Sequence, residues 1–510
     1  MWVCRRKDFS RKQKRRRPFV LRLLQQINSL TPAKDCYKAN IPTGTIVIQV
    51  NKMATFNFYR KVTKPMTMPS NTQSHLSDRG AHAAYKPVRV DLEIYQKAME
   101  NHYDPKSNPE GCFAMNVAEN HLCWEMLRNR IERVTREKSI PDWVASYGDP
   151  AGVLSFRKAT ATYLSEFLVK QKVDPETLAF SVGATSTIEM TAFLLANPGD
   201  TAVIPAPSYP VYTMDIGVIP DIKRYDLQTH HELHELQAGI PINTEQLEAA
   251  KQEIEAQGSR FRLLILTSPD NPTGGIYSQA QLESMADWCE ANEVHLIVNE
   301  IYGLSKIDIS HPELQKDYPN PIPFLSFGQL MAKRKSPFLH LWYSFSKDLG
   351  ISGLRIGLTH SYNTDFIAGY RNAGLSHGIS NYTQWVMQEV LEDWEFIADF
   401  VVASQEALTQ SYLIVVRNLR ALGIPYSPSY GSLFVWMDLS EFLNEESEQG
   451  QHQLWLEIFE ESGVLLTPGA GFGHSKRGLF RMVISSIDHD ALEEAMERLK
   501  GYILRKRHHE

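Results

Sequence analysis

Residues 344–357 read SFSKDLGISGLRIG and come directly after a short apolar run that is typical of a buried strand. At this place the side chain of a lysine can be fixed in one conformation and partly desolvated. Its amine can then attack a carbonyl group. Ser344 and Ser346 offer hydroxyl groups to a phosphate, and the guanidinium group of Arg355 can bind two phosphate oxygens. The segment therefore predicts that Lys347 is a reactive lysine beside a phosphate site.

Residues 183–185, which read Gly-Ala-Thr, follow a predicted strand at residues 178–182 and open a predicted helix. Their backbone N–H groups have no partner within the first turn of that helix, and the helix dipole adds positive charge there. Ala184 and Thr185 therefore mark a second place where a phosphate can bind.

From about residue 178 onward, short apolar runs alternate with helical stretches, which predicts an α/β fold with a largely parallel sheet. Several runs are apolar on both faces, as in strands that are covered on both sides. We expect strands at residues 178–182, 201–204, 263–267, 294–298, 340–343 and 354–359. We expect helices at 186–196 and 279–292, a helical stretch at 385–423, strands at 433–437, 464–467 and 480–485, and a last helix at 488–505.

A chain of 510 residues is long for one hydrophobic core, so we expect two lobes with a cleft between them. We divide it into a basic N-terminal extension (1–52), an arm with part of the small domain (53–145), a large domain (146–385) and a C-terminal small domain (386–510). Residues 1–22 hold ten Lys or Arg against one acid. Three explanations fit this segment. It is a nuclear address, an organelle presequence, or a stretch that is not translated because Met53 is the true start.

Since the net charge is −6, the chain after the basic segment is mildly acidic. This charge predicts no nucleic-acid-binding surface on that part of the chain. Because no apolar run approaches the length of a membrane span, we expect no membrane partner and a cytoplasmic location. Five cysteines without metal-ligand spacing predict free thiols and no zinc site. His230 and His234 are four residues apart, but a Glu does not follow His230 and Gly239 lies close, so we expect no metal here.

The segments around Lys347 and Ala184 resemble those of the fold-type I pyridoxal-phosphate-dependent aminotransferase family (class I/II). The resemblance implies a large domain with a mostly parallel seven-stranded sheet and a smaller α/β domain. It implies that the cofactor is pyridoxal 5'-phosphate, held covalently by the catalytic Lys347. The residues implied to bind the cofactor phosphate are Ala184, Thr185, Ser344, Ser346 and Arg355.

Four further positions follow the same family pattern. Tyr209, in PSYP at 207–210, is implied to stack on the pyridine ring. Asn271, in SPDNPTG at 268–274, and Tyr302, in NEIY at 299–302, are implied to bond to the phenolic oxygen of the cofactor. Arg481 is implied to bind the α-carboxylate of the substrate, for which a bidentate guanidinium is suited.

Within this family the chain is most similar to 1-aminocyclopropane-1-carboxylate synthase-like proteins, over residues 101–504. The stretches NPEG at 108–111 and AENHLC at 118–123 resemble a synthase motif in which the glutamate, here Glu119, contributes to substrate choice. The stretch SKDLG at 346–350 is also closer to the synthase than to general aminotransferases.

Two positions depart from the family pattern. Asn299 stands where the family has an Asp that keeps the pyridine nitrogen protonated, and an amide cannot supply that negative charge, so the pKa of the nitrogen should fall. Pro150 stands where the synthase has a tyrosine near the cofactor, whereas Tyr147 matches an aminotransferase tyrosine that often crosses a dimer interface.

We therefore expect a homodimer with shared active sites that acts on an α-amino acid as a class I/II aminotransferase. One alternative is a lyase of the synthase type, which eliminates at the β or γ carbon, including carbon–sulfur lysis and cyclopropane formation. The other alternative is a catalytically degenerate protein that still binds pyridoxal phosphate.

Overall fold

The computed structural model describes residues 37–41, 44–48, 75–85 and 91–509. The chain divides into two compact units, Met1–Pro87 and Val88–Glu510. In the first unit, β1 (Tyr37–Ile41) and β2 (Gly44–Ile48) form an antiparallel pair, and α2 (Asp78–Tyr85) is a short helix. The basic segment at residues 1–22 and Met53 lie outside the described residues.

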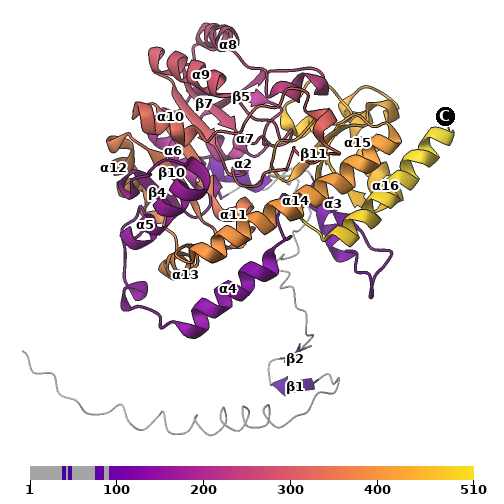
Figure 1. Ribbon diagram of the computed structural model, residues 1–510, viewed down its shortest axis with the longest axis horizontal. Helices are drawn as coiled ribbons and strands as arrows, with labels where there is room; N and C mark the ends of the chain where they lie inside the picture. The colour runs from indigo at the N-terminus through magenta and orange to yellow at the C-terminus, as the bar shows by residue number, and fades with distance from the viewer. Residues whose placement is uncertain (1–36, 42–43, 49–74, 86–90, 510) are drawn as a thin grey trace, which may run out of the picture. The chain divides into compact units, whose positions relative to one another are not determined.

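A seven-stranded sheet forms the centre of the second unit, and all of its strands run in one direction except β10 (Figure 1). Its strands, in order across the sheet, are β4 (Leu178–Ser181), β10 (Gly357–Ser361), β9 (Leu339–Ser344), β8 (His295–Asn299), β7 (Phe261–Thr267), β5 (Thr201–Ala206) and β6 (Lys223–Gln228). The predicted α/β fold with a mostly parallel seven-stranded sheet is confirmed.

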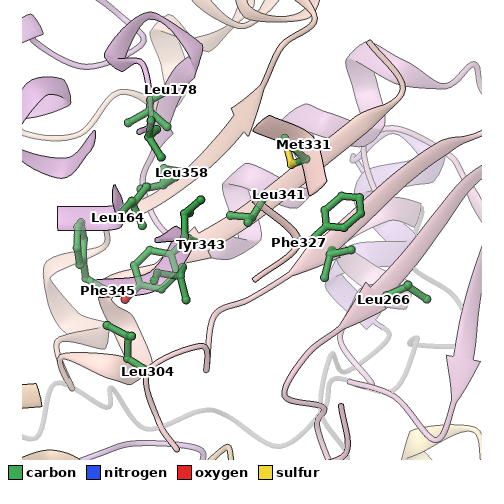
Figure 2. Packing of buried hydrophobic residues seen from close by; sticks show 14 of the residues in the cluster. Leu164, Leu178, Leu266, Leu304, Phe327, Met331, Leu341, Tyr343, Phe345 and Leu358 are labelled. Carbon is green, nitrogen blue, oxygen red and sulfur yellow. The ribbon is translucent and has the colours of Figure 1, made fainter. Parts of the chain in front are cut away.

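Helices cover both faces of this sheet because alternate strand residues point to opposite sides. Leu264 and Leu266 of β7 belong to one buried cluster, and Leu263 and Ile265 belong to another. The first cluster, shown in part around Tyr343 in Figure 2, also takes residues from α5 (Leu154–Tyr163), α8 (Thr244–Ala256), α9 (Gln279–Ala291), α10 (Phe327–Arg334) and α13 (Asn381–Leu391). The second takes residues from α6 (Ala184–Leu195), α7 (Tyr212–Gly217) and α12 (Thr364–Ala373). We call this assembly the large lobe.

A second lobe, the small lobe, is built on the antiparallel sheet of β11 (Phe434–Asp438), β14 (Leu479–Val483) and β13 (Thr467–Pro468). Beside it, β12 (Val464–Leu465) pairs in parallel with β3 (Phe113–Ala114). Its helices are α3 (Leu92–Glu100), α15 (Glu448–Ser462) and α16 (His489–His509).

The long helix α14 (Trp394–Leu422) joins the cores of the two lobes. Its Ile397 and Phe400 belong to the first cluster of the large lobe, whereas Leu408 and Leu419 belong to the core of the small lobe. Figure 1 shows α14 in orange, running from α13 towards α16. The remaining helices are α4 (Trp124–Glu137) and α11 (Phe345–Asp348).

Three details differ from the sequence-based expectation. The strand β6 was not expected, because it is a polar edge strand whose side chains are mostly half-exposed. The strand expected at 354–359 begins only at Gly357, because Arg355 has a left-handed backbone with φ of 55°. The strand expected at 464–467 is two short strands, β12 and β13, which belong to different sheets.

Within the described ranges, none of the helices combines the length and the apolar character that crossing a membrane requires. The described cysteines, Cys112, Cys123 and Cys289, are free thiols. In the same part of the chain, no cluster of three or more His, Cys, Asp or Glu residues has the geometry to hold a metal ion.

Candidate active site

Lys347 lies in α11, the short helix that directly follows β9. Ser344 caps this helix, since its Oγ accepts the N–H of Ser346 at 3.2 Å and donates to the carbonyl oxygen of Ile356 at 2.6 Å. The Nζ atom of Lys347 donates to the carbonyl oxygen of Ala118 at 2.5 Å. Burial is the main reason why the pKa of Lys347 falls to about 8, so its amine loses its proton far more readily than that of an exposed lysine.

The first turn of α6 lies against the start of β10, next to Ser344. Gly357 pairs with Ser344 of β9 on one side and with the end of β4 on the other. Gly183 caps α6 with φ of 93°, and a Cβ atom there would overlap the guanidinium group of Arg355. A Cβ atom at Gly357 would lie 2.5 Å from the carbonyl carbon of Gly183 and 2.7 Å from the nitrogen of Ala184. The two glycines thus let an arginine and a helix N-terminus meet beside Ser344.

This arrangement brings together the residues that the sequence predicted for phosphate binding. The guanidinium group of Arg355 is exposed and donates from Nη1 to the carbonyl oxygen of Ser352 at 2.8 Å. Ser346 Oγ lies 2.8 Å from Ser344 Oγ. Thr185 is exposed in the first turn of α6, where its N–H group is free to bind an anion. Positive charge and hydroxyl groups therefore gather at one end of the site.

Asn299 is the last residue of β8, and both the oxygen and the nitrogen of its side-chain amide form hydrogen bonds. Its Oδ1 accepts the backbone N–H of Ile301 at 3.2 Å, and its Nδ2 donates to the hydroxyl of Tyr212 at 2.8 Å. Since a backbone N–H can only donate, the bond from Ile301 fixes which end of the amide is oxygen. The hydroxyl of Tyr212 also lies 2.9 Å from Thr267 Oγ1, and Tyr209 packs edge-on against Tyr212 with ring centroids 5.3 Å apart.

Sequence reasoning did not identify Tyr212 and Thr267 as part of this group. Thr267 is the last residue of β7 and pairs with Asn299 of β8. Tyr212 follows Tyr209 by three residues, at the start of α7. A search for polar residues at the ends of adjacent parallel strands could have found Thr267, whereas the direction of the Tyr212 side chain depends on how α7 packs.

Arg481 of the small lobe bonds directly to the loop that follows β7. Its Nη1 donates to Asn271 Oδ1 at 2.9 Å, and its Nη2 donates to the carbonyl oxygen of Asn116 at 2.6 Å. The guanidinium carbon lies 4.5 Å from the ring centroid of Phe434, against which Tyr302 also packs. Arg481 is buried, and the pKa of Tyr302 is raised by its own burial. The predicted carboxylate-binding arginine therefore lies with Asn271 and Tyr302.

Two other predicted residues differ in their placement. Glu119 lies near Lys347, and its carboxylate forms an ion pair with His121 at 3.1 Å. Tyr147 is fully exposed in the loop before α5, so within a single chain it is not part of the pocket around Lys347.

Residues 114–499 match the sequence model of the family Aminotransferase class I and II, and the chain therefore belongs to this family of pyridoxal-phosphate-dependent enzymes. One relative is 1-aminocyclopropane-1-carboxylate synthase 7 of Arabidopsis thaliana, 29% identical over 443 residues, which cover 85% of this chain and 96% of that protein. Another is 1-aminocyclopropane-1-carboxylate synthase 1 of Prunus mume, 29% identical over 440 residues, or 84% of this chain and 85% of that protein.

Solved structures agree in fold. Aspartate aminotransferase from Thermus thermophilus with maleate superposes with a TM-score of 0.66 at 20% identity, over 84% of this chain and 100% of that chain. An archaeal alanine:glyoxylate aminotransferase reaches a TM-score of 0.68 at 16% identity, over 84% of this chain and 98% of that chain. The expected family, fold and enzyme class are confirmed.

Proposed function

We propose that the chain binds pyridoxal 5'-phosphate through Lys347 and acts on an α-amino acid as an aminotransferase of class I/II. The observation that carries the proposal is the partly buried Lys347 amine, whose pKa desolvation lowers to about 8. It lies directly after a buried strand, near a helix N-terminus and an arginine that can bind an anion. A lysine in this state is suited to bond to a carbonyl carbon and then to act as a general base.

The residues around Lys347 fit the cofactor. The N-terminus of α6, Ser344, Ser346 and Arg355 would hold its phosphate. The backbones of Gly357 and Gly183 approach so closely that no Cβ atom fits between them, which brings the start of α6 beside Ser344. Tyr209, Asn271, Asn299 and Tyr302 are the side chains proposed to contact its ring. When bound, the cofactor withdraws electrons from the bonds at the substrate's α carbon.

Arg481 would bind and orient the substrate through its α-carboxylate. The rings of Phe434 and Phe472, with centroids 4.5 Å and 5.1 Å from its guanidinium carbon, exclude water from the group. Asn271 accepts from Nη1 and Thr467 accepts from Nη2, and these bonds fix the orientation of the planar guanidinium group. A planar carboxylate can then bind to a guanidinium that is already oriented, while Lys347 Nζ removes the proton from the α carbon.

A second candidate function, elimination at the β or γ carbon, is favoured by Asn299. Its amide oxygen is occupied by the N–H of Ile301, so the group can offer only N–H donors to its other neighbours. A donor at this place stabilises an unprotonated ring nitrogen, which is a weaker electron sink and makes full transamination harder. The two synthase relatives are consistent with this alternative.

We also propose that the enzyme is a homodimer in which Tyr147 enters the site of the partner. Leu154, Leu375 and Tyr382 are large apolar side chains that are also exposed in the single chain. Asn381, beside Tyr382, donates from Nδ2 to the carbonyl oxygen of Ser146 at 2.6 Å, which fixes the loop that carries Tyr147. Burial of such residues in a dimer would stabilise it.

The function is tested by adding pyridoxal phosphate to the purified chain and recording absorbance with a panel of α-amino acids and S-adenosylmethionine. Release of keto acid, ammonia and thiol is assayed in parallel. Keto acid without ammonia supports the aminotransferase, and ammonia or thiol release supports β or γ elimination. Release of the thioether part of S-adenosylmethionine without ammonia supports cyclopropane formation. Lys347→Ala should abolish the absorbance band that depends on a covalent bond between the lysine and the cofactor, whereas Lys333→Ala, at an exposed lysine of α10, should not. A Lys347→Ala spectrum equal to that of the wild type would reject the proposal.

A further inference from the structure

The segment that carries Glu119 is bonded to Lys347 on two sides. The carbonyl oxygen of Ala118 accepts Lys347 Nζ, and Asn120 Nδ2 donates to the carbonyl oxygen of Lys347 at 3.1 Å. A Cβ atom at Gly350, where φ is 68°, would overlap the carbonyl oxygen of Asn120. The segment thus lies tightly against the loop that carries the lysine.

The same segment is bonded to the residues that follow β14. The N–H of His121 donates to the carbonyl oxygen of Ser485 at 2.8 Å, and Ser485 Oγ donates to the carbonyl oxygen of Glu119 at 2.7 Å. The Nδ1 atom of the His121 ring lies 3.1 Å from the carbonyl oxygen of Ser486. Backbone contacts therefore fix the positions from which the side chains of Glu119 and His121 extend.

The imidazole of His121 lies between two hydrogen-bond acceptors. Nδ1 faces the carbonyl oxygen of Ser486, and Nε2 lies 3.1 Å from Oε2 of Glu119. Neither group can donate when the glutamate is ionised, so both bonds require a proton on each ring nitrogen. In agreement, the bond to Glu119 raises the pKa of His121, and the bond to His121 lowers the pKa of Glu119.

Lys347 therefore lies among several charged groups. The Glu119 carboxylate favours the protonated amine, whereas Arg481 and Arg355 favour the neutral amine. The cation next to Glu119 is His121, so the attraction that Glu119 exerts on the lysine depends on the charge of that imidazole.

We propose that His121 is a positioning residue whose imidazolium holds the Glu119 carboxylate and offsets the attraction of that carboxylate for the Lys347 ammonium. Its importance for catalysis rests on the proposed function, in which Lys347 must present a neutral amine. As pH rises and His121 loses its proton, the attraction of Glu119 is no longer offset, and Lys347 holds its own proton more strongly. His121 thus lowers the pH at which Lys347 loses its proton, so that the reactive neutral amine is present closer to neutral pH.

The test measures the titration of Lys347 itself. The full chain is freed of bound cofactor with hydroxylamine, labelled with acetic anhydride over a range of pH, and digested, and acetylation of the peptide that contains Lys347 is followed by mass spectrometry. His121→Gln can keep a bond to Ser486 but carries no charge, so it should raise the pH midpoint of labelling by about half to one unit. Glu119→Gln should lower the midpoint, because it removes the group that stabilises the ammonium.

The opposite signs of these two shifts distinguish an electrostatic role from a structural one. His452→Gln, at an exposed histidine of α15, serves as the control and should leave the midpoint unchanged. His121→Lys restores a positive charge and should return the midpoint towards that of the wild type, which also tests the proposal if His121→Gln does not fold. A His121→Gln midpoint equal to the wild type, or lowered as in Glu119→Gln, would overturn the proposal.

The labelling reads the amine directly, so its outcome does not depend on cofactor binding. A chain that takes up no pyridoxal phosphate would reject the proposed function. The labelling midpoints of His121→Gln and Glu119→Gln would still decide whether the charge of His121 shifts the pKa of Lys347.

Discussion

The Nη1 atom of Arg481 lies 2.9 Å from Oδ1 of Asn271, and this bond joins a strand of the small lobe to the loop after β7. It couples the proposed carboxylate-binding group to a residue proposed to contact the cofactor. A change in how the two lobes pack would change the distance between these two residues.

Arg481→Lys should weaken substrate binding more than it changes the chemical step. A lysine has only three N–H donors on one nitrogen, so it cannot replace the bonds of Arg481 to Asn271, Asn116 and Thr467 and also bind both oxygens of a carboxylate. Loss of one charge-assisted bond, at about 1.5–3 kcal/mol, should raise KM for the amino acid by about ten- to a hundredfold. Steady-state kinetics would measure this, with Arg477→Lys, at an exposed ion pair with Glu448, as control. An unchanged KM would contradict the assignment.

Gly357→Ala should impair cofactor binding and stability, whereas Gly353→Ala in the same segment should not. The new Cβ at Gly357 would meet the backbone of Gly183, which cannot rotate away as a side chain could. Such overpacking costs about 1–3 kcal/mol. At Gly353 no atom lies within 4 Å of the added carbon. Fluorescence titration with pyridoxal phosphate and thermal unfolding would compare the two variants. Equal behaviour would show that the backbones of Gly357 and Gly183 are not as close as described.

Asn299→Asp should accelerate removal of the α proton. A carboxylate at this place would hold the ring nitrogen of the cofactor protonated and make it a stronger electron sink. Exchange of the substrate's α hydrogen in deuterated water, followed by NMR, measures this step without requiring turnover. Asn363→Asp keeps a good cap at the start of α12 and should change nothing. Exchange at the wild-type rate in Asn299→Asp would place residue 299 away from the ring nitrogen.

Stability should depend on pH through the buried pair His295 and His340. Nδ1 of His295 lies 3.0 Å from Nε2 of His340, and burial lowers the pKa of these groups to about 2 and about 3. Both stay neutral when folded, so below the unfolded value of about 6.5 the unfolded chain binds more protons and the folded state loses stability as pH falls. Buried carboxyls such as Glu300, whose pKa is raised to about 8, titrate with the opposite sign, so a difference measurement is needed.

That measurement is urea unfolding of the wild type and of His295→Gln at several values of pH. The destabilisation caused by His295→Gln should shrink as pH falls below about 6.5, because the variant has one fewer histidine to protonate on unfolding. His452→Gln serves as the exposed control. A difference that stays constant with pH would mean that His295 is not held neutral.

The proposed dimer predicts complementation between two inactive variants. In a mixture of Lys347→Ala and Tyr147→Ala chains, a heterodimer has one site with both residues intact. Activity should therefore return when the two proteins are unfolded and refolded together, and stay absent when they are mixed as folded homodimers. No recovery after refolding would place Tyr147 outside the site of the partner.

The class of fold could be predicted from the chain alone, and so could the position of Lys347 directly after a buried strand, because both depend on local patterns. Apolar runs with short turns predict buried parallel strands. The approach of Gly183 to Arg355 and Gly357, by contrast, joins segments that lie far apart in the chain. The polar edge strand β6 escaped prediction because its local pattern is not that of a buried strand.

The neighbours of the predicted residues depended on tertiary packing. Arg481 and Asn271 are 210 positions apart, and Asn120 and Lys347 are 227 apart, so only the docking of the two lobes brings each pair together. The contact of Tyr212 with Asn299 requires the packing of α7 against the sheet. Strand register and lobe packing are sums of many weak, non-local contacts, and no short stretch of sequence carries them.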